Sequence, residues 1–199
     1  MSLSGNPKRP VVFLDRDGTL NEEIGYIRDV ARLELIAGAA DAVRKLNCAG
    51  VAAVLVTNQT GAARGYYPES HIQDLNNRLV TLLSAAGARL DAVYYCPHLK
   101  DGSVGELSFE CGCRKPAPGL VDRALAEHPD LDASRAYVVG DKATDIELAC
   151  NCKMKGVLVT TGYGQQVLDG QYQWQVEPDH TASDIVAAID WILNDLGCT

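Results

Sequence analysis

The sequence predicts an α/β fold built on a doubly wound parallel sheet with three layers. Short apolar runs recur along the chain, each run ends in polar residues, and stretches with helical periodicity lie between the runs. Continuous apolar runs of this length suit strands that are buried on both faces. Strands that alternate with helices form parallel sheets. The 199 residues are enough for one domain with a substantial core, so we expect a single domain over residues 1–199.

The expected strands are the apolar runs, which polar residues follow. The runs occupy residues 11–14, 54–56, 93–95, 137–139 and 157–159. In sheets of this kind, ligands bind beyond the carboxyl ends of the strands. The polar residues that follow the runs are therefore expected to converge on one crevice, although they are far apart in the chain.

Helices are expected in the segments between the strands. Residues 39–48 place Val43 and Leu46 on one face of a helix. Residues 68–82 begin with Pro68, a favoured first residue, and then repeat apolar side chains at the helical period. Further helices are expected over residues 118–125, 144–150 and 185–196.

The composition excludes several classes of function. A net charge of −8 argues against binding to nucleic acid or anionic membranes, which needs a basic surface. No run approaches the ~20 apolar residues of a membrane span, and the N-terminal segment has no apolar signal-peptide core. We therefore expect a cytoplasmic monomer without nucleic-acid or membrane partners. In a reducing compartment, seven cysteines indicate a metal site or catalysis rather than disulfides.

Two aspartates follow the first expected strand. In extended backbone, side chains at i and i+2 share a face, so the carboxylates of Asp15 and Asp17 can point into one small volume. Two close anions need a cation between them or a proton on one of them. Mg²⁺ prefers oxygen ligands, and Asp141, after a later strand, offers a third. The alternative interpretation is that both aspartates cap a turn in which Gly18 makes the bend.

A cluster of metal-ligating residue types occupies the loop 96–113. The candidate zinc ligands are Cys96, His98, Cys111 and Cys113. Each pair has i, i+2 spacing, so both of its side chains can project the same way. Three thiolates and one imidazole form a closed tetrahedral zinc site with no open position for catalysis. Zinc would order this polar loop and position Arg114 and Lys115, which follow it directly. The alternative is a set of independent buried cysteines.

Taken together, the motifs resemble those of the haloacid dehalogenase superfamily of phosphohydrolases. That superfamily combines an Asp-x-Asp-Gly-Thr run, a Thr that closes a strand, a lone Lys and an acidic pair after a strand. Here the motifs stand in the same order, at Asp15 to Thr19, Thr57 with Asn58, Lys115, and Asp141 with Asp145. The resemblance implies a Rossmann-like fold of the superfamily's type and a magnesium-dependent phosphatase.

The resemblance also implies a role for each motif. Asp15 would attack phosphorus and form an aspartyl phosphate. Asp17 would protonate the leaving oxygen and then deprotonate the attacking water. Mg²⁺ would be held by Asp15, the backbone carbonyl of Asp17 and Asp141. Thr57 and Lys115 would hydrogen-bond the phosphoryl oxygens, so the expected catalytic residues are Asp15, Asp17, Thr57 and Lys115.

Two groups in the superfamily combine such a zinc loop with Arg-Lys-Pro: the histidinol-phosphate phosphatases and the heptose bisphosphate phosphatases. The chain looks closer to the second group because of Gly25-Tyr26, the run from Thr57 to Gly65 and the long loop before Cys111. This resemblance implies hydrolysis of the 7-phosphate of a heptose 1,7-bisphosphate, in the synthesis of activated heptose for lipopolysaccharide or other surface glycans. It implies substrate contacts from Glu23, Ile24, Gly25, Tyr26, Thr57, Asn58, Gln59, Thr60, Arg64, Arg114, Lys115 and Lys142.

The spacing of the motifs leaves little room for a cap domain. Only about forty residues separate the first two motifs, and they already contain an expected helix, so we expect a capless site. A phospho-receiver signalling domain is a competing hypothesis, because it also uses an Asp, a Thr and a Lys on a doubly wound sheet. Receivers place that Asp on a later strand and lack a partner two residues on, whereas Asp15 follows the first strand and has Asp17.

Overall fold

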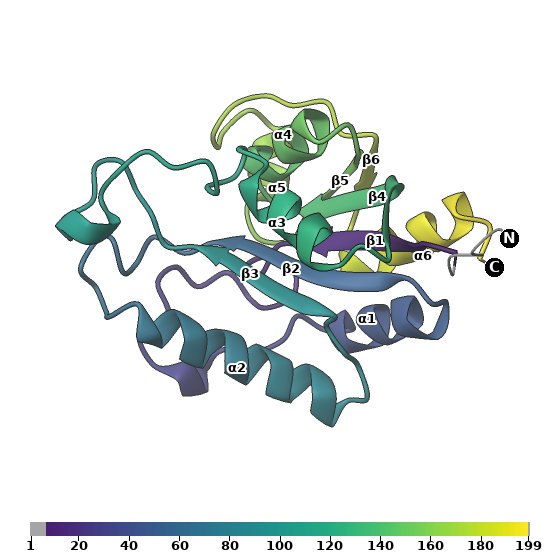
Figure 1. The fold of residues 1–199 in the computed structure, drawn as a ribbon, viewed down its shortest axis with the longest axis horizontal. Helices are drawn as coiled ribbons and strands as arrows, with labels where there is room; N and C mark the ends of the chain where they lie inside the picture. The colour runs from purple at the N-terminus through teal and green to yellow at the C-terminus, as the bar shows by residue number, and fades with distance from the viewer. Residues whose placement is uncertain (1–6, 199) are drawn as a thin grey trace, which may run out of the picture.

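The computed structural model describes residues 7–198 and contains one six-stranded parallel sheet in the order β3-β2-β1-β4-β5-β6. The strands are β1 (Arg9–Leu14), β2 (Ala52–Asn58), β3 (Ala92–Cys96), β4 (Leu131–Gly140), β5 (Lys155–Val159) and β6 (His180–Ala182). The α-helices are α1 (Ala39–Cys48), α2 (Ser70–Ala85), α3 (Gly119–Glu127), α4 (Ala143–Asn151), α5 (Gly164–Leu168) and α6 (Ile185–Asp195). Helices cover both faces of the sheet, which confirms the predicted three-layer, doubly wound architecture (Figure 1).

Alternate residues of the central strands pack into two separate apolar clusters. On β1, Val12 and Leu14 pack in the cluster that includes α1, α2 and α6. Val11 and Phe13 point the other way, into the cluster that includes α3 and α4. All four side chains are fully buried. This burial on both faces is the reason why the strands are continuous apolar runs rather than alternating ones.

The order of the strands fixes where a ligand can bind. The chain runs from β1 outward to β2 and β3, and then returns to the other side of β1 to place β4, β5 and β6. Leu14 pairs with Leu55 on one side and with Val139 on the other, so β1 and β4 end at nearly the same level, and β2 continues three residues further, to Asn58. In doubly wound sheets, ligands bind at this switch point. Asp15 and Asp141, which follow β1 and β4, therefore stand on its two sides.

The loops at this edge of the sheet are long, but none forms a cap domain within residues 7–198. The connection from β1 to α1 contains only the 3₁₀-helix Val30–Arg32, and the connection from β3 to α3 contains only the 3₁₀-helix Gly105–Leu107. The second connection projects away from the sheet as an extended teal loop (Figure 1). The site beneath these loops is therefore open, as the capless prediction requires.

The main differences from the prediction are two short elements and several helix ends. Strand β6 has three residues and α5 has five, and so few residues carry no measurable period. Helix α2 begins at Ser70 rather than at Pro68. Of the helices in the described part of the chain, none is long and apolar enough to cross a membrane.

Candidate active site

Asp15 lies directly beyond β1, next to a buried lysine. The backbone N–H of Asp15 still donates to the carbonyl of Val139 (2.9 Å), so its position is set by the sheet. Lys115 Nζ lies 2.8 Å from Asp15 Oδ1 and 2.6 Å from Asp145 Oδ1, and it donates to the carbonyl of Val56 (2.9 Å). Burial opposes the charge of Lys115, but these two carboxylates outweigh burial and raise its pKa. Lys115 is thus held as a cation beside Asp15.

The backbone of Lys115 is fixed by β2. Asn58, the last residue of that strand, accepts a hydrogen bond from the N–H of Lys115 and donates one to its carbonyl, both at 3.0 Å. Thr57, one residue earlier, is buried and lines the same cavity as Asp15 and Lys115. The sequence motif of Thr57 and Asn58 therefore positions the distant lysine as well as offering a hydroxyl to the cavity.

Three carboxylates converge beneath the cavity. One oxygen of each of Asp15, Asp141 and Asp145 lies within 4.8 Å of the others, and all three residues are buried. Burial, with the charges of Asp15 and Asp145, raises the pKa of Asp141 to about 7 despite the neighbouring Lys142. Such a cluster is stable as anions only around a cation.

A side-chain cation occupies part of this cluster. Lys142 Nζ lies 3.1 Å from Asp141 Oδ1, 3.0 Å from Glu23 Oε2, 3.2 Å from the carbonyl of Asp17 and 3.9 Å from Asp15 Oδ2. The carboxylates of Asp15 and Asp141 and the carbonyl of Asp17 are the three groups that the sequence predicted as magnesium ligands. Because a cation already sits among these hard oxygen donors, the residues fit Mg²⁺.

Glycines allow the loops to close around Asp141. Gly18 has a positive φ of 83°, and a Cβ on it would lie 2.2 Å from Asp141 Oδ2. Gly162, after β5, also has a positive φ, and its Cβ would meet the same oxygen at 2.2 Å. A larger residue at either position would exclude the backbone from the acidic cluster.

The carboxylate of Asp17 does not join the three-carboxylate cluster. Its Oδ1 accepts hydrogen bonds from Asn21 Nδ2 (3.0 Å) and from Arg16, and its Oδ2 accepts from Gln59 Nε2 (2.7 Å). Burial opposes ionisation of Asp17, but the Arg16 guanidinium and these donors outweigh it and lower the pKa. The i, i+2 spacing placed Asp17 at the same cavity as Asp15, but these donors decide where its oxygens point.

One open cavity of about 280 Å³ connects these groups. Most residues predicted to contact substrate line it: Glu23, Gly25, Tyr26, Thr57, Asn58, Gln59, Thr60, Arg64, Arg114, Lys115 and Lys142. Ile24 is not among the lining residues and is 44 % exposed, because the turn closed by the Gly25 N–H and Glu23 Oε1 points it outward.

Several lining residues were not expected from the sequence: Arg16, Ile27, Tyr67, Thr144, Tyr163, Tyr172 and Gln173. Tyr163 and Tyr172 stack with ring centroids 4.2 Å apart, and Lys142 Nζ lies 5.3 Å from the centroid of Tyr163. These two tyrosines lie in loops beyond the last recognised motif, where no spacing marked them. The sequence held one signal for Tyr67, which is Gly61. A Cβ at position 61 would lie 2.1 Å from the Tyr67 hydroxyl oxygen, so only a glycine leaves room for it.

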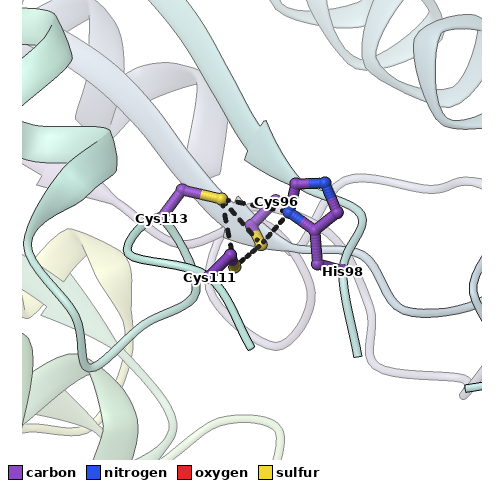
Figure 2. Close-up of side chains that lie close together, drawn as sticks. All are labelled: Cys96, His98, Cys111 and Cys113. Carbon is purple, nitrogen blue, oxygen red and sulfur yellow. Dashed lines mark hydrogen bonds between the residues drawn. The ribbon is translucent and has the colours of Figure 1, made fainter. Parts of the chain in front are cut away.

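The four candidate zinc ligands come together at the end of β3 (Figure 2). The three sulfurs are 3.1–3.5 Å apart, and His98 Nδ1 lies 3.3 Å from Cys113 Sγ and 3.6 Å from Cys96 Sγ. A tetrahedral zinc with Zn–S bonds of about 2.3 Å would separate its sulfurs by roughly 3.8 Å. All the cysteines are free. The set of three sulfurs and one imidazole nitrogen therefore fits a closed structural zinc site.

This cluster anchors the chain that leads into the active site. Cys96 ends β3, and Cys113 is followed by Arg114 and Lys115. Arg114 Nη1 lies 3.4 Å from the carbonyl of His98, so its side chain returns along the cluster. Phe109 packs on the His98 ring at a centroid distance of 4.3 Å. The cluster thus positions two basic residues of the cavity.

Replacing Lys115 by Met is expected to destabilise the protein by about 3–5 kcal/mol, because it leaves Asp15 and Asp145 buried without their cation. Urea unfolding followed by circular dichroism, without added metal, measures this loss. Lys100→Met is the matched control, since Lys100 pairs with Glu110 on the surface and its side chain is 69 % exposed. Equal midpoints for the two variants would contradict the prediction.

Comparison with known proteins agrees with this geometry. The HAD-hydrolase-like family matches residues 112–188. A D-glycero-D-manno-heptose-1,7-bisphosphate 7-phosphatase from Thermosynechococcus vestitus is 50% identical over 192 residues, which cover 94% of this chain and 97% of the relative. A D-glycero-beta-D-manno-heptose-1,7-bisphosphate 7-phosphatase from Yersinia pestis is 41% identical, over 94% of this chain and 91% of its own.

A solved structure of the same kind of enzyme is also similar. The D,D-heptose 1,7-bisphosphate phosphatase from B. bronchiseptica, complexed with magnesium and phosphate, matches with a TM-score of 0.79 and 29% identity. The match covers 94% of this chain and 99% of that one. Half of the residues are identical to one relative over nearly the whole length of both chains. The chain belongs to the D-glycero-D-manno-heptose-1,7-bisphosphate 7-phosphatase family of the haloacid dehalogenase superfamily.

Proposed function

We propose that the protein is a magnesium-dependent phosphatase that removes the 7-phosphate of D-glycero-D-manno-heptose 1,7-bisphosphate, with Asp15 as its nucleophile. The observation that carries this proposal is the meeting of Asp15, Lys115 and Thr57 in one open cavity above a buried acidic cluster. Family membership supplies the substrate. The 199 residues act in this proposal as a single catalytic domain.

In the first step, a carboxylate oxygen of Asp15 attacks phosphorus and the bond to the sugar oxygen breaks. Asp17 passes a proton to that leaving oxygen. Asp17 is ionised without substrate, so the proton arrives with the monoanionic form of the ester, whose second pKa is about 6. Lys115 and the Thr57 hydroxyl hold the phosphoryl oxygens, and positioning of this kind is most of what phosphoryl transfer requires.

In the second step, Asp17 takes a proton from a water molecule, and the water oxygen attacks phosphorus. The bond to Asp15 breaks, which releases inorganic phosphate and restores the carboxylate of Asp15. The proton on Asp17 then leaves with the phosphate, so Asp17 is ionised again for the next cycle. Mg²⁺, held by Asp15, Asp141 and the carbonyl of Asp17, would neutralise charge on the phosphoryl group. Lys142, which contacts those oxygens in the structure, would then be available to the substrate.

Basic and polar side chains further out suit a substrate that carries a second phosphate. Arg64 and Arg114 line the cavity on the side of the zinc loop. An arginine offers a fixed, always-charged fork that matches phosphate. Tyr26, whose hydroxyl lies 3.4 Å from Thr60 Oγ1, offers a further contact to sugar hydroxyls. We assign the sugar and the distal phosphate of the substrate to this side.

A panel of phosphate esters tests the substrate. We expect kcat/KM for heptose 1,7-bisphosphate to exceed that for histidinol phosphate by at least about 100-fold, because histidinol phosphate has no second phosphate and loses two charged contacts. Fructose 1,6-bisphosphate keeps a second phosphate, so a lower kcat/KM for it would report on the contacts with the sugar. Phosphate release with both anomers of the heptose bisphosphate, in the presence of Mg²⁺, measures this. A preference for histidinol phosphate would reject the substrate while leaving the chemistry in place.

The setting of the reaction belongs to the same proposal. We place it in the cytoplasm, in the synthesis of activated heptose for surface glycans, with the protein acting as a monomer. The net charge of −8 supports the expectation that anionic membranes are not partners. The same charge supports the expectation that nucleic acids are not partners.

A further inference from the structure

Arg16 is a charged residue that the mechanism above does not use, and it stands between Asp15 and Asp17 in the sequence. Arg16 is only 2 % exposed. Its Nη1 donates to Asn76 Oδ1 (3.0 Å), and its Nη2 donates to Gln59 Oε1 (2.7 Å) and to Asp17 Oδ2 (3.1 Å). A buried guanidinium persists only where its donors are matched in this way.

Asn76 holds the far end of this arginine. It lies on the buried face of α2, among apolar residues that include Leu75 and Leu79. Asn76 is 5 % exposed, and Arg16 is the partner of its side-chain oxygen. A polar residue is costly on an apolar helix face unless it is hydrogen-bonded, so this contact ties α2 to Arg16.

The arginine determines which way the amide of Gln59 faces. A guanidinium has donors and no acceptor, so the oxygen of Gln59 must face Arg16. The amide nitrogen of Gln59 must then face the opposite side. There it donates to Asp17 Oδ2 (2.7 Å) and to Thr57 Oγ1 (3.0 Å). The donors of Arg16 on one side and the carboxylate of Asp17 on the other thus fix the orientation of the Gln59 amide.

The orientation of Gln59 in turn sets the direction of the Thr57 hydroxyl. A hydroxyl has one hydrogen to donate and lone pairs to accept with. Because Thr57 Oγ1 accepts from Gln59, its hydrogen is available to another acceptor, and residues 7–198 supply none. Thr57 lines the cavity beside Asp15. The free hydrogen is therefore directed to a phosphoryl oxygen bound at Asp15.

We propose that Arg16 is a positioning residue that sets the direction of the hydrogen-bond chain Arg16–Gln59–Thr57, so that Thr57 always donates to the transferring phosphoryl group. The same arginine and Gln59 hold Asp17 in place. This inference rests on the proposed phosphoryl transfer at Asp15. It does not depend on which sugar phosphate is the substrate.

The test replaces Gln59 by Glu, which has nearly the same shape but no N–H donors. The new carboxylate still accepts from Arg16, and the oxygen that replaces Nε2 accepts the hydrogen of Thr57, whereas Nε2 donated to Thr57 Oγ1. That oxygen also faces Asp17 Oδ2, to which Nε2 donated, and the double-mutant cycle below separates this second effect. With Mg²⁺ and a generic phosphate ester, we expect kcat to fall about 100-fold, the cost of one misdirected donor to a transition state. KM should change far less, and the inhibition constant of orthovanadate should rise in step with the loss of kcat.

Arg16→Lys is the second variant, because a lysine keeps the charge but cannot serve Asn76, Gln59 and Asp17 together. It should lose kcat in the same way. Arg44→Lys is the matched control, since Arg44 pairs with Asp41 on the surface of α1 and lies outside the site. Thermal denaturation checks that each variant is folded.

A double-mutant cycle with Thr57→Val separates this chain from the contact of Gln59 with Asp17. If Gln59 acts through Thr57, the double variant should be only slightly slower than Thr57→Val alone. If the losses of kcat in the two single variants multiply in the double variant, or if Gln59→Glu keeps the wild-type kcat, the inference is overturned. If Asp15→Asn also hydrolysed the ester, the proposed function itself would fail, which is a distinct result.

Discussion

Asp15→Asn is expected to lower kcat by at least about 10⁴-fold, as removal of a covalent nucleophile does in other enzymes. Asparagine has the same shape, but its amide does not attack phosphorus. The protein should remain folded, because Lys115 keeps Asp145 at 2.6 Å and the carbonyl of Val56 at 2.9 Å. The substitution also removes one of three crowded carboxylates, which relieves repulsion in the acidic cluster.

Phosphate release from heptose 1,7-bisphosphate measures this effect, with circular dichroism and a melting curve for each protein. A second readout is rapid acid quench with ³²P-labelled substrate, in which the wild type should hold label covalently and the variant should not. Asp132→Asn is the matched control, because Asp132 pairs with Arg135 at the surface before β4 reaches the core. Appreciable turnover by Asp15→Asn would reject Asp15 as the nucleophile.

Cys113→Ser is expected to remove zinc from the loop 96–113, and with it both stability and activity. Structural zinc contributes about 10–16 kcal/mol in small zinc-finger peptides. In this larger fold, a loss of even a few kcal/mol would lower the melting temperature by about 10 °C. Arg114 and Lys115 follow Cys113, so release of the loop would also displace two basic residues of the cavity. A displacement of about 1 Å costs on the order of 100-fold in rate.

Metal analysis of the purified protein should find one zinc per chain in the wild type and much less in Cys113→Ser. Cys150→Ser is the matched control, since Cys150 is an exposed thiol on α4 outside the cluster. Dialysis against a strong chelator, followed by Mg²⁺ alone, should leave the wild type as inactive as the variant. A chelated protein with an unchanged melting temperature would refute the zinc site.

The fold could be predicted because its central strands are continuous apolar runs, which are easy to recognise in the sequence. Residues such as Val12 and Phe13 pack on opposite faces of one sheet, so both had to be apolar. The short elements β6 and α5 were not predicted, because contacts with neighbouring elements determine their positions. Strand β6 pairs with β5, and Val167 of α5 packs on Leu158. Their own sequences are too short to specify them.

The site could be predicted only where a motif marked it. Asp15, Thr57 and Asp141 stand at strand ends, and parallel strands bring such ends together. Lys115 lies in the loop between β3 and α3, where the resemblance to the motifs of the superfamily marked it. Tyr163 and Tyr172 lie outside any motif, and only the folding of the loops after β5 brings them to the cavity. Ile24 sits within a marked loop, yet its side chain faces outward.

The sequence by itself determined the longer strands, the pair Asp15 and Asp17 at the end of the first strand, and the two close pairs of cysteine and histidine in the loop 96–113, because apolar runs and local spacing specify them. Tertiary structure alone decided which hydrogen-bond and ion-pair partners each carboxylate has. It placed Lys115 between Asp15 and Asp145, and it turned the oxygens of Asp17 toward Asn21 and Gln59. The physical reason is that a buried charge takes its partners from whichever segments the fold packs around it, and sequence spacing does not encode those partners.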